Sequence, residues 1–123
     1  MIYSSIYNEK NSVINRLVEL LSEFNNGIII EDQINYVIEL MEYSDTYPFI
    51  SVTPDGIIKL EYDYNDGKIS NYLEFNIDKD LVVNAYHRVI KGIIKESEYF
   101  TNISKSDLND LINKWKDDIK EYE

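Results

Sequence analysis

The chain lacks cysteine altogether and has only two prolines, four glycines and one histidine among its 123 residues. The absence of cysteine excludes disulfides and thiolate chemistry. No apolar run approaches the roughly 18 residues that a membrane-spanning helix needs, so no membrane partner is expected. Residues 1–10 lack the basic start and the apolar stretch of a signal peptide. We therefore expect a cytoplasmic protein, folded as one domain over residues 1–123.

Basic residues are also scarce, because 12 Lys and Arg stand against 23 Asp and Glu, for a formal net charge of −11. A chain this acidic repels phosphate groups, so we expect it to bind neither nucleic acid nor an anionic membrane directly. No basic residue occurs between Arg16 and Lys59, whereas acids recur throughout that stretch. Solubility alone is the simplest explanation of the acidity, although it does not explain a long stretch of one sign.

Two helices are predicted before residue 45. Apolar residues recur at helical spacing in residues 8–25 (Ile14, Leu17, Val18, Leu21, Phe24) and in residues 31–44 (Ile34, Val37, Ile38, Met41). At 100° per residue, five acids of the second helix project within a sector of roughly 140° beside its apolar stripe. We call these five residues the acidic ridge: Glu31, Asp32, Glu39, Glu42 and Asp45. With no lysine or arginine nearby in the sequence, the ridge should concentrate negative potential.

Strands are predicted in residues 48–77, where polar and apolar residues alternate between two turn signals, Pro54-Asp55-Gly56 and Asn65-Asp66-Gly67-Lys68. A period of two with one apolar face indicates antiparallel strands. Residues 81–100 fit either a hairpin around Gly92 or a helix, and their β-branched and aromatic residues favour the hairpin.

A last helix should begin at Ser104, because Ser104 and Asp107 have the spacing of a capping box. The predicted fold class is therefore α+β: two N-terminal helices, an antiparallel sheet of about four or five strands, and a C-terminal helix.

Catalytic patterns are weak. Pro54-Asp55 followed by Asp66-Gly67-Lys68 has the outline of a PD-(D/E)xK nuclease site, in which carboxylates and a lysine converge on a metal ion. Here the second part lies at a hairpin tip, where side chains point apart, so a metal-dependent nuclease is the least favoured interpretation. His87 has no second histidine or cysteine to act with, and we interpret it as structural. We expect no catalytic residues, no metal site and no cofactor.

Aromatic residues are abundant, with 11 tyrosines in the chain. Tyr43 and Tyr47 follow the second helix, and Tyr72 falls on the polar face of a predicted strand. Tyrosine is enriched in interfaces but also packs into cores, and for these three residues both interpretations stay open.

Residues 48–62, PFISVTPDGIIKLEY, resemble a block in short, uncharacterised bacterial and mobile-element proteins, Pro-x-Ile-Ser-x-Thr-Pro-Asp-Gly-Gly-Ile-x-Leu-Glu-Trp. Ile57 stands at the second glycine and Tyr62 at the tryptophan, while Leu73-Glu74-Phe75 is similar to the strand that follows the block. The resemblance covers about residues 48–77. It implies a shared hairpin and no particular activity.

The sequence thus predicts a non-enzymatic inhibitor or adaptor, of the antitoxin or phage anti-defence kind, that binds another protein. The acidic ridge, with Tyr43 and Tyr47, would face a basic surface of that partner, and a protein that itself binds nucleic acid is a candidate. The alternative is a protein that binds a small ligand with tyrosines of its sheet.

Overall fold

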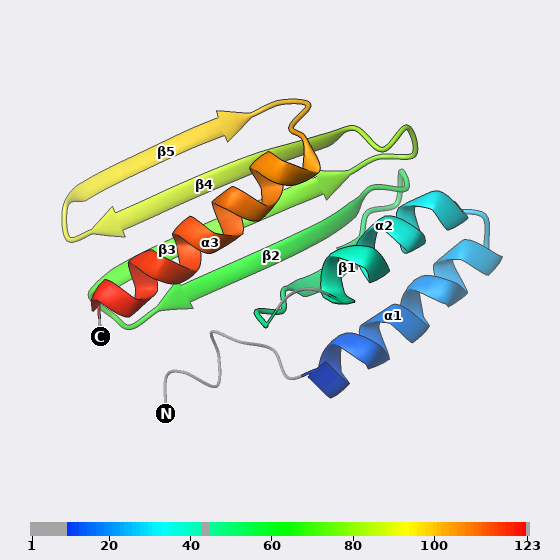
Figure 1. Cartoon of the computed structure of the whole chain (residues 1–123), viewed down its shortest axis with the longest axis horizontal. Coiled ribbons are helices and arrows are strands. Elements are labelled where there is room, and N and C mark those ends of the chain that lie inside the picture. Colours follow the sequence, from blue (N-terminus) through cyan, green and yellow to red (C-terminus); the bar gives the residue numbers. More distant parts are fainter. Residues whose placement is uncertain (1–9, 43–44, 123) are drawn as a thin grey trace.

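The computed structural model describes residues 10–42 and 45–122 (Figure 1). In this part of the chain there are three helices, α1 (Lys10–Asn25), α2 (Glu31–Glu42) and α3 (Lys105–Tyr122). There are also five strands: β1 (Phe49–Val52), β2 (Ile58–Asn65), β3 (Ile69–Ile77), β4 (Val83–Lys91) and β5 (Ile94–Phe100). The predicted α+β class is confirmed, with two helices before the sheet and one after it.

The five strands form one antiparallel sheet in the order β1-β2-β3-β4-β5, so each strand pairs with its neighbours in sequence. The hairpin prediction for residues 81–100 is confirmed, because Lys91 pairs with Ile94 across Gly92 and Ile93. Gly92 has a φ of 61° and is the first central residue of this two-residue turn, as in a type II′ turn. Leu81 lies before the strand, since β4 begins at Val83.

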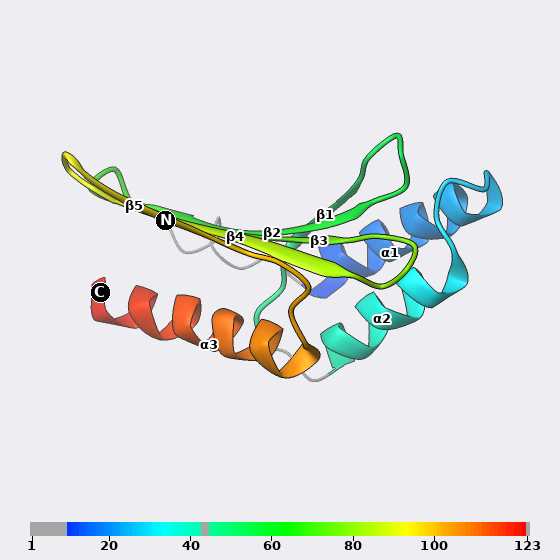
Figure 2. The same ribbon diagram turned by 90° about the horizontal axis from the view of Figure 1, so that it is seen from above.

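The three described helices lie on one side of the sheet, and no described helix covers the other face, called the open face below (Figure 2). Helix α3 packs on β3, where the indole Nε1 of Trp115 donates a hydrogen bond of 2.9 Å to the carbonyl of Asn71. Trp115 is fully buried and meets the ring of Tyr62 edge-on, at 5.7 Å between centroids. The core therefore lies between the helices and the middle strands.

A buried amide ties α2 to the sheet. Gln33 is fully buried, and its Nε2 donates to the carbonyls of Gly56 and Ile77 at 2.9 and 3.0 Å. Its Oε1 accepts a hydrogen bond from the backbone N–H of Ile30. Gly56 has a φ of 88°, and a Cβ there would lie 2.3 Å from the carbonyl oxygen of Ile28, so only glycine fits this turn. The start of α2 is thus held rigidly against the β1–β2 turn.

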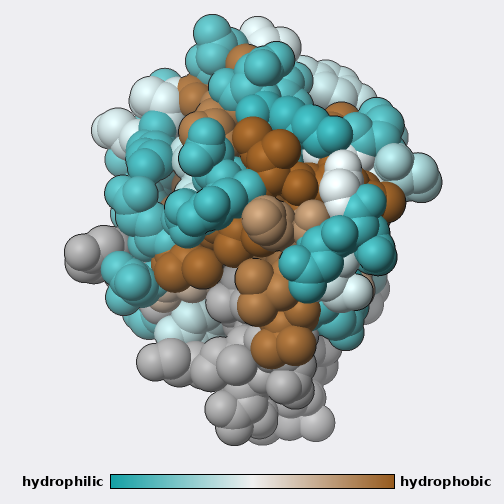
Figure 3. All heavy atoms as spheres, turned by 90° about the vertical axis from the view of Figure 1, so that its right-hand side faces the viewer, coloured by the Kyte–Doolittle hydropathy of each residue, from teal (hydrophilic) through white to brown (hydrophobic). Residues whose placement is uncertain are grey.

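The apolar residues of α1 are only partly buried. Leu20 is buried at 2% exposure, whereas Val18 is 60% exposed and Leu21 51% exposed. Ile38 of α2 is also exposed, and the side chains of Ile14 and Leu17 lie outside the described residues. The physical reason is that α1 packs mainly against the short edge strand β1 and α2, so it buries a narrow face. Figure 3 shows apolar side chains at the surface on this side of the molecule.

Candidate protein-binding surfaces

The acidic ridge lies on the outer face of α2. The inner face buries Gln33, Ile34, Tyr36, Val37 and Met41. All five acids of the ridge are exposed. Glu31 and Asp32 are in the first turn, where their charge also complements the positive end of the helix dipole. Asp45 lies in a bend beyond Glu42, so the structure does not place all five acids on the helix as predicted.

The ridge is less negative than the sequence predicted, because α3 supplies two lysines. Lys105 Nζ lies 2.9 Å from Glu39 Oε2, and Lys116 Nζ lies 2.6 Å from Asp45 Oδ1. The bond to Lys116 holds the pKa of Asp45 below its ordinary value. The expectation of an unneutralised ridge was therefore wrong for Glu39 and Asp45, whose partners are 66 and 71 residues away in the sequence.

The other three acids of the ridge, Glu31, Asp32 and Glu42, have no ion pair with any described residue. They stand at the two ends of α2. The remaining negative potential of the ridge is thus concentrated in two places, with the paired Glu39 between them.

Of the two tyrosines predicted beside the ridge, the structure describes only Tyr47. Tyr47 is partly buried and packs against the hydrophobic core. Tyr43 lies outside the described residues. For Tyr47 the structure therefore favours the core interpretation that the sequence left open.

Three other tyrosines gather on the open face of the sheet. The rings of Tyr86 and Tyr99 lie 4.6 Å apart and tilted by 33°, and the ring of Tyr72 lies 6.2 Å from that of Tyr86. The guanidinium of Arg88 sits 5.3 Å from the centre of the Tyr72 ring. We call these four residues the tyrosine row. The sequence alone could have placed two of these four residues together, since a two-residue turn at Gly92 sets Tyr86 opposite Tyr99.

Carboxylates hold the tyrosine row in place. The hydroxyl of Tyr72 lies 2.8 Å from Glu61 Oε2 and 2.7 Å from Glu74 Oε1, and burial together with these carboxylates raises the pKa of Tyr72. Glu61 and Glu74 are opposite each other across β2 and β3, where like charges repel. Lys59, 3.6 Å from Glu74, offsets part of that repulsion.

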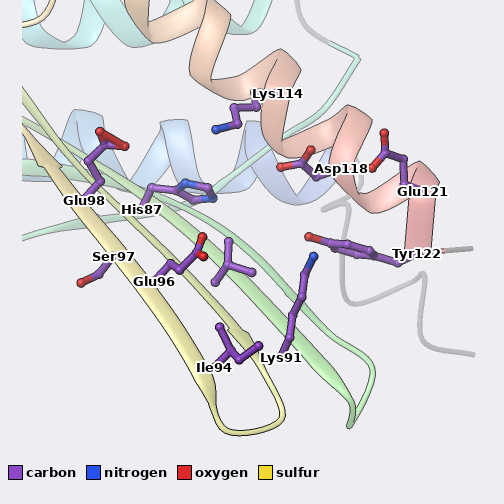
Figure 4. A pocket seen from close by; sticks show the side chains of 11 residues that line it. His87, Lys91, Ile94, Glu96, Ser97, Glu98, Lys114, Asp118, Glu121 and Tyr122 are labelled. Atoms are coloured by element: carbon purple, nitrogen blue, oxygen red, sulfur yellow. The ribbon is translucent and has the colours of Figure 1, made fainter.

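A hollow of about 710 Å³ opens on the helix side, between α3 and the β4–β5 hairpin (Figure 4). We call it the β5 trough. Val89 and Ile94 contribute apolar surface to it, and Lys91 and Lys114 contribute positive charge. Its four carboxylates come from β5 (Glu96, Glu98) and from α3 (Asp118, Glu121). The trough exists because α3 lies over the middle of the sheet and leaves the β5 edge uncovered.

His87 lines the trough and shares the helix-side face with Val83, Ala85 and Val89. Its Nε2 lies 2.7 Å from Oδ1 of Asn71, a fully buried residue. Burial, together with the charge of Lys114, lowers the pKa of His87, while Asp118 and Glu98 oppose that shift. His87 is therefore neutral at neutral pH, and its contact with Asn71 ties β4 to β3.

The two acids of the nuclease-like pattern, Asp55 and Asp66, form hydrogen bonds within the turns in which they lie. Asp55 accepts a hydrogen bond from the hydroxyl of Thr53, which lowers the pKa of Asp55. Asp66 Oδ1 accepts hydrogen bonds from the backbone N–H groups of Lys68 and Ile69, at 2.8 and 2.7 Å. Within residues 10–42 and 45–122, no group of three His, Asp or Glu side chains is placed to hold a metal ion.

No protein-family model, no curated protein and no solved structure matches the chain. The resemblance of residues 48–62 to a bacterial block therefore stays a prediction. Among the described residues, no helix is both long and apolar enough to cross a membrane.

Proposed function

We propose that this protein is a non-enzymatic inhibitor or adaptor that binds another protein through the outer face of α2. The observation that carries the proposal is a set of three exposed acids that form no ion pair with a described residue, Glu31, Asp32 and Glu42, on a helix whose inner face is buried. The partner would present a basic surface. A protein that itself binds nucleic acid has such a surface, which is why antitoxin-like and anti-defence roles fit.

Rigidity supports this proposal. Gln33 fastens the start of α2 to the β1–β2 turn and to β3 through two hydrogen bonds, and a third, from the N–H of Ile30, fixes its side chain. Acids on a helix held in this way lose little backbone freedom when they bind, so more of the interaction energy remains as affinity.

The spacing of the acids at the two ends of α2 predicts the spacing of basic residues on the partner. Glu42 lies eleven positions after Glu31, which is about 16 Å along a helix at 1.5 Å per residue. Two basic clusters at that separation would match the ends of α2, with the exposed Ile38 between them. Glu39 and Asp45 contribute less, because exposed ion pairs such as theirs with Lys105 and Lys116 are worth about 0–1 kcal/mol.

The test is a matched pair of charge reversals. One variant carries Glu31→Lys, Asp32→Lys and Glu42→Lys, and its control carries Asp80→Lys, Asp110→Lys and Asp117→Lys, which are exposed acids elsewhere with the same change in net charge. Each protein serves as bait in an extract of the native host, at increasing salt. We expect the control to retain a partner that the α2 variant loses, with capture by the wild type weakening as salt rises. Equal capture by both variants would contradict the proposal.

The tyrosine row favours a second candidate function, the binding of a small planar ligand on the open face. Tyr99 is 76% exposed and stacks on Tyr86, so a flat ligand could extend the stack. A thermal-shift screen of aromatic metabolites tests this function. A stabilising compound should lose its effect with Tyr99→Ala and keep it with the α2 charge reversals.

A further inference from the structure

Strand β5 is an edge strand with both faces uncovered. Each residue from Ile94 to Tyr99 is exposed, although alternate residues of this strand face the helix side. Most edge strands of a two-layer domain bury one face. The β4–β5 hairpin instead extends past α3, as Figures 1 and 2 show.

The backbone of β5 offers hydrogen-bonding groups along its outer side. The two-residue turn at Gly92 makes Lys91 and Ile94 a hydrogen-bonded pair. Because such pairs alternate along an antiparallel ladder, the N–H and C=O groups of Lys95, Ser97 and Tyr99 point away from β4. The backbone groups of these three alternate residues can form hydrogen bonds with an added strand.

The β5 trough lies beneath this edge and carries most of the charge that an added strand would meet. Glu96, Glu98, Asp118 and Glu121 line it, and none of them forms an ion pair within the described residues. Of the two lysines of the trough, Lys91 lies over the ring of Tyr122, 5.2 Å from its centre. The four carboxylates outnumber the two lysines, so the trough favours a positively charged occupant.

A second copy of β5 is a poor occupant. Two copies of β5 related by a two-fold axis normal to the sheet would pair antiparallel through their outward residues, which are odd-numbered. Odd-numbered residues would therefore lie opposite odd-numbered ones, and even-numbered residues opposite even-numbered ones. With Ser97 opposite Ser97, Glu96 faces Glu98 twice. The neighbouring registers set Glu96 opposite Glu96, or Glu98 opposite Glu98. Like charges in directly opposed positions repel, so β5 resists pairing with itself.

We propose that β5 accepts an extended segment of another protein as a sixth strand, and that this segment carries lysine or arginine at alternate positions. Its outward N–H and C=O groups pair with those of Lys95, Ser97 and Tyr99. Its basic side chains enter the β5 trough, between Glu96 and Glu98 on one wall and Asp118 on the other. The inference shares with the proposed function only that the partner is a protein with basic residues, since it uses a different surface.

The test uses a synthetic seven-residue peptide of alternating lysine and threonine, equal in length to β5. A matched peptide has glutamate in place of lysine. Binding is followed by fluorescence anisotropy, and amide hydrogen exchange of the protein is measured by NMR with and without peptide. We expect the lysine peptide to bind at least about tenfold more tightly than the glutamate peptide. The amides of Lys95, Ser97 and Tyr99 should become protected, because in the protein alone they point away from β4 and should exchange rapidly.

Two variants separate backbone pairing from charge. Ser97→Pro removes an outward N–H at a position where proline is tolerated on an edge strand, and it should abolish binding of the lysine peptide. Glu96→Lys with Glu98→Lys should reverse the preference between the two peptides. The Glu31, Asp32 and Glu42 reversals should leave peptide binding unchanged, so failure here is distinct from failure of the proposed function.

Three outcomes would overturn the inference. The first is equal binding of the two peptides, and the second is binding without protection of the three outward amides. The third is sedimentation of the wild-type protein as a dimer and of the Ser97→Pro variant as a monomer. That result would mean that β5 pairs with a second copy of the chain.

Discussion

The two edges of the sheet differ in what covers them. At one edge, α1 lies against β1, and the guanidinium of Arg16 donates hydrogen bonds from Nε (2.7 Å) and Nη2 to the backbone carbonyl of Ile50. Ile50 is fully buried. At the other edge, none of the described helices packs closely against β5, and Ile94 is 60% exposed. One isoleucine belongs to the core and the other does not.

The difference shows how a small sheet can separate stability from binding. The covered edge contributes apolar burial and closes a site of unwanted strand pairing. The bare edge contributes little to stability, and its alternating charges oppose self-association while leaving the backbone accessible. We therefore expect substitutions to have large effects near β1 and small ones at β5.

The largest contrast should come from the two edge isoleucines. Ile50→Ala removes a fully buried side chain beneath α1, and we expect it to lower the free energy of unfolding by about 2–5 kcal/mol. Ile94→Ala should change that free energy by less than about 0.5 kcal/mol, since its side chain is largely in solvent. Urea denaturation of the two variants measures both values. Similar losses at the two positions would show that β5 is covered in solution and would break the comparison.

A smaller effect is expected from Arg16, which closes the β1 edge. Arg16→Met removes the charge-assisted bonds to the Ile50 carbonyl and the contact with the ring of Phe49, and we expect a loss of about 1–3 kcal/mol. The control is Glu19→Gln, which removes only an exposed ion pair with Arg16 and should cost less than about 0.5 kcal/mol. Hydrogen exchange should accelerate in β1 and stay unchanged in β5. Equal losses for the two variants would assign the effect to the ion pair.

Much of the fold was predictable because its signals are local. Gly67 and Gly92 have φ values of 88° and 61°, as expected of turn residues placed between alternating segments. Ser104 caps α3 by accepting a hydrogen bond from the N–H of Asp107 at 3.1 Å, as the capping-box spacing predicted. The exposure of Val18 and Leu21 was not predictable, because periodicity shows that a helix has an apolar face and not how much of that face a neighbour covers.

The candidate surfaces were less predictable because they depend on contacts between distant segments. The pairing of Glu39 with Lys105 requires α3 to lie beside α2, which no local pattern reports. The β5 trough results from the position of α3 over β3, and this too is a property of the packing. The opposition of Tyr86 and Tyr99 could have been found, since it follows from the turn at Gly92 alone.

A pH effect on stability is expected from His87, which lines the β5 trough. Burial lowers the pKa of His87, so the unfolded chain binds a proton more readily than the folded one. Stability from this residue is therefore fully present above about pH 6.5, the ordinary histidine value, and is lost as the pH falls through the lower folded pKa.

His87 is the only histidine, so NMR titration of its ring measures this pKa directly. The melting temperature should fall between pH 7 and pH 5 by more for the wild type than for His87→Gln. A ring that titrates at or above 6.5 would mean that the trough is more open to water than its geometry indicates.

The smallest effect, and one of opposite sign, is expected at Tyr62 in the covered middle of the sheet. Its ring meets Phe75 and Trp115 edge-on, but its buried hydroxyl has no hydrogen-bond partner among the described residues. Tyr62→Phe keeps the ring contacts and removes a polar group that lost its hydration on folding, so stability should stay unchanged or rise by up to about 1 kcal/mol. The matched control is Tyr72→Phe on the open face, which leaves Glu61 and Glu74 opposed without a hydroxyl between them and should destabilise the protein. Thermal denaturation of the two variants measures the difference, and a loss of more than about 1 kcal/mol for Tyr62→Phe would show that the buried hydroxyl is satisfied.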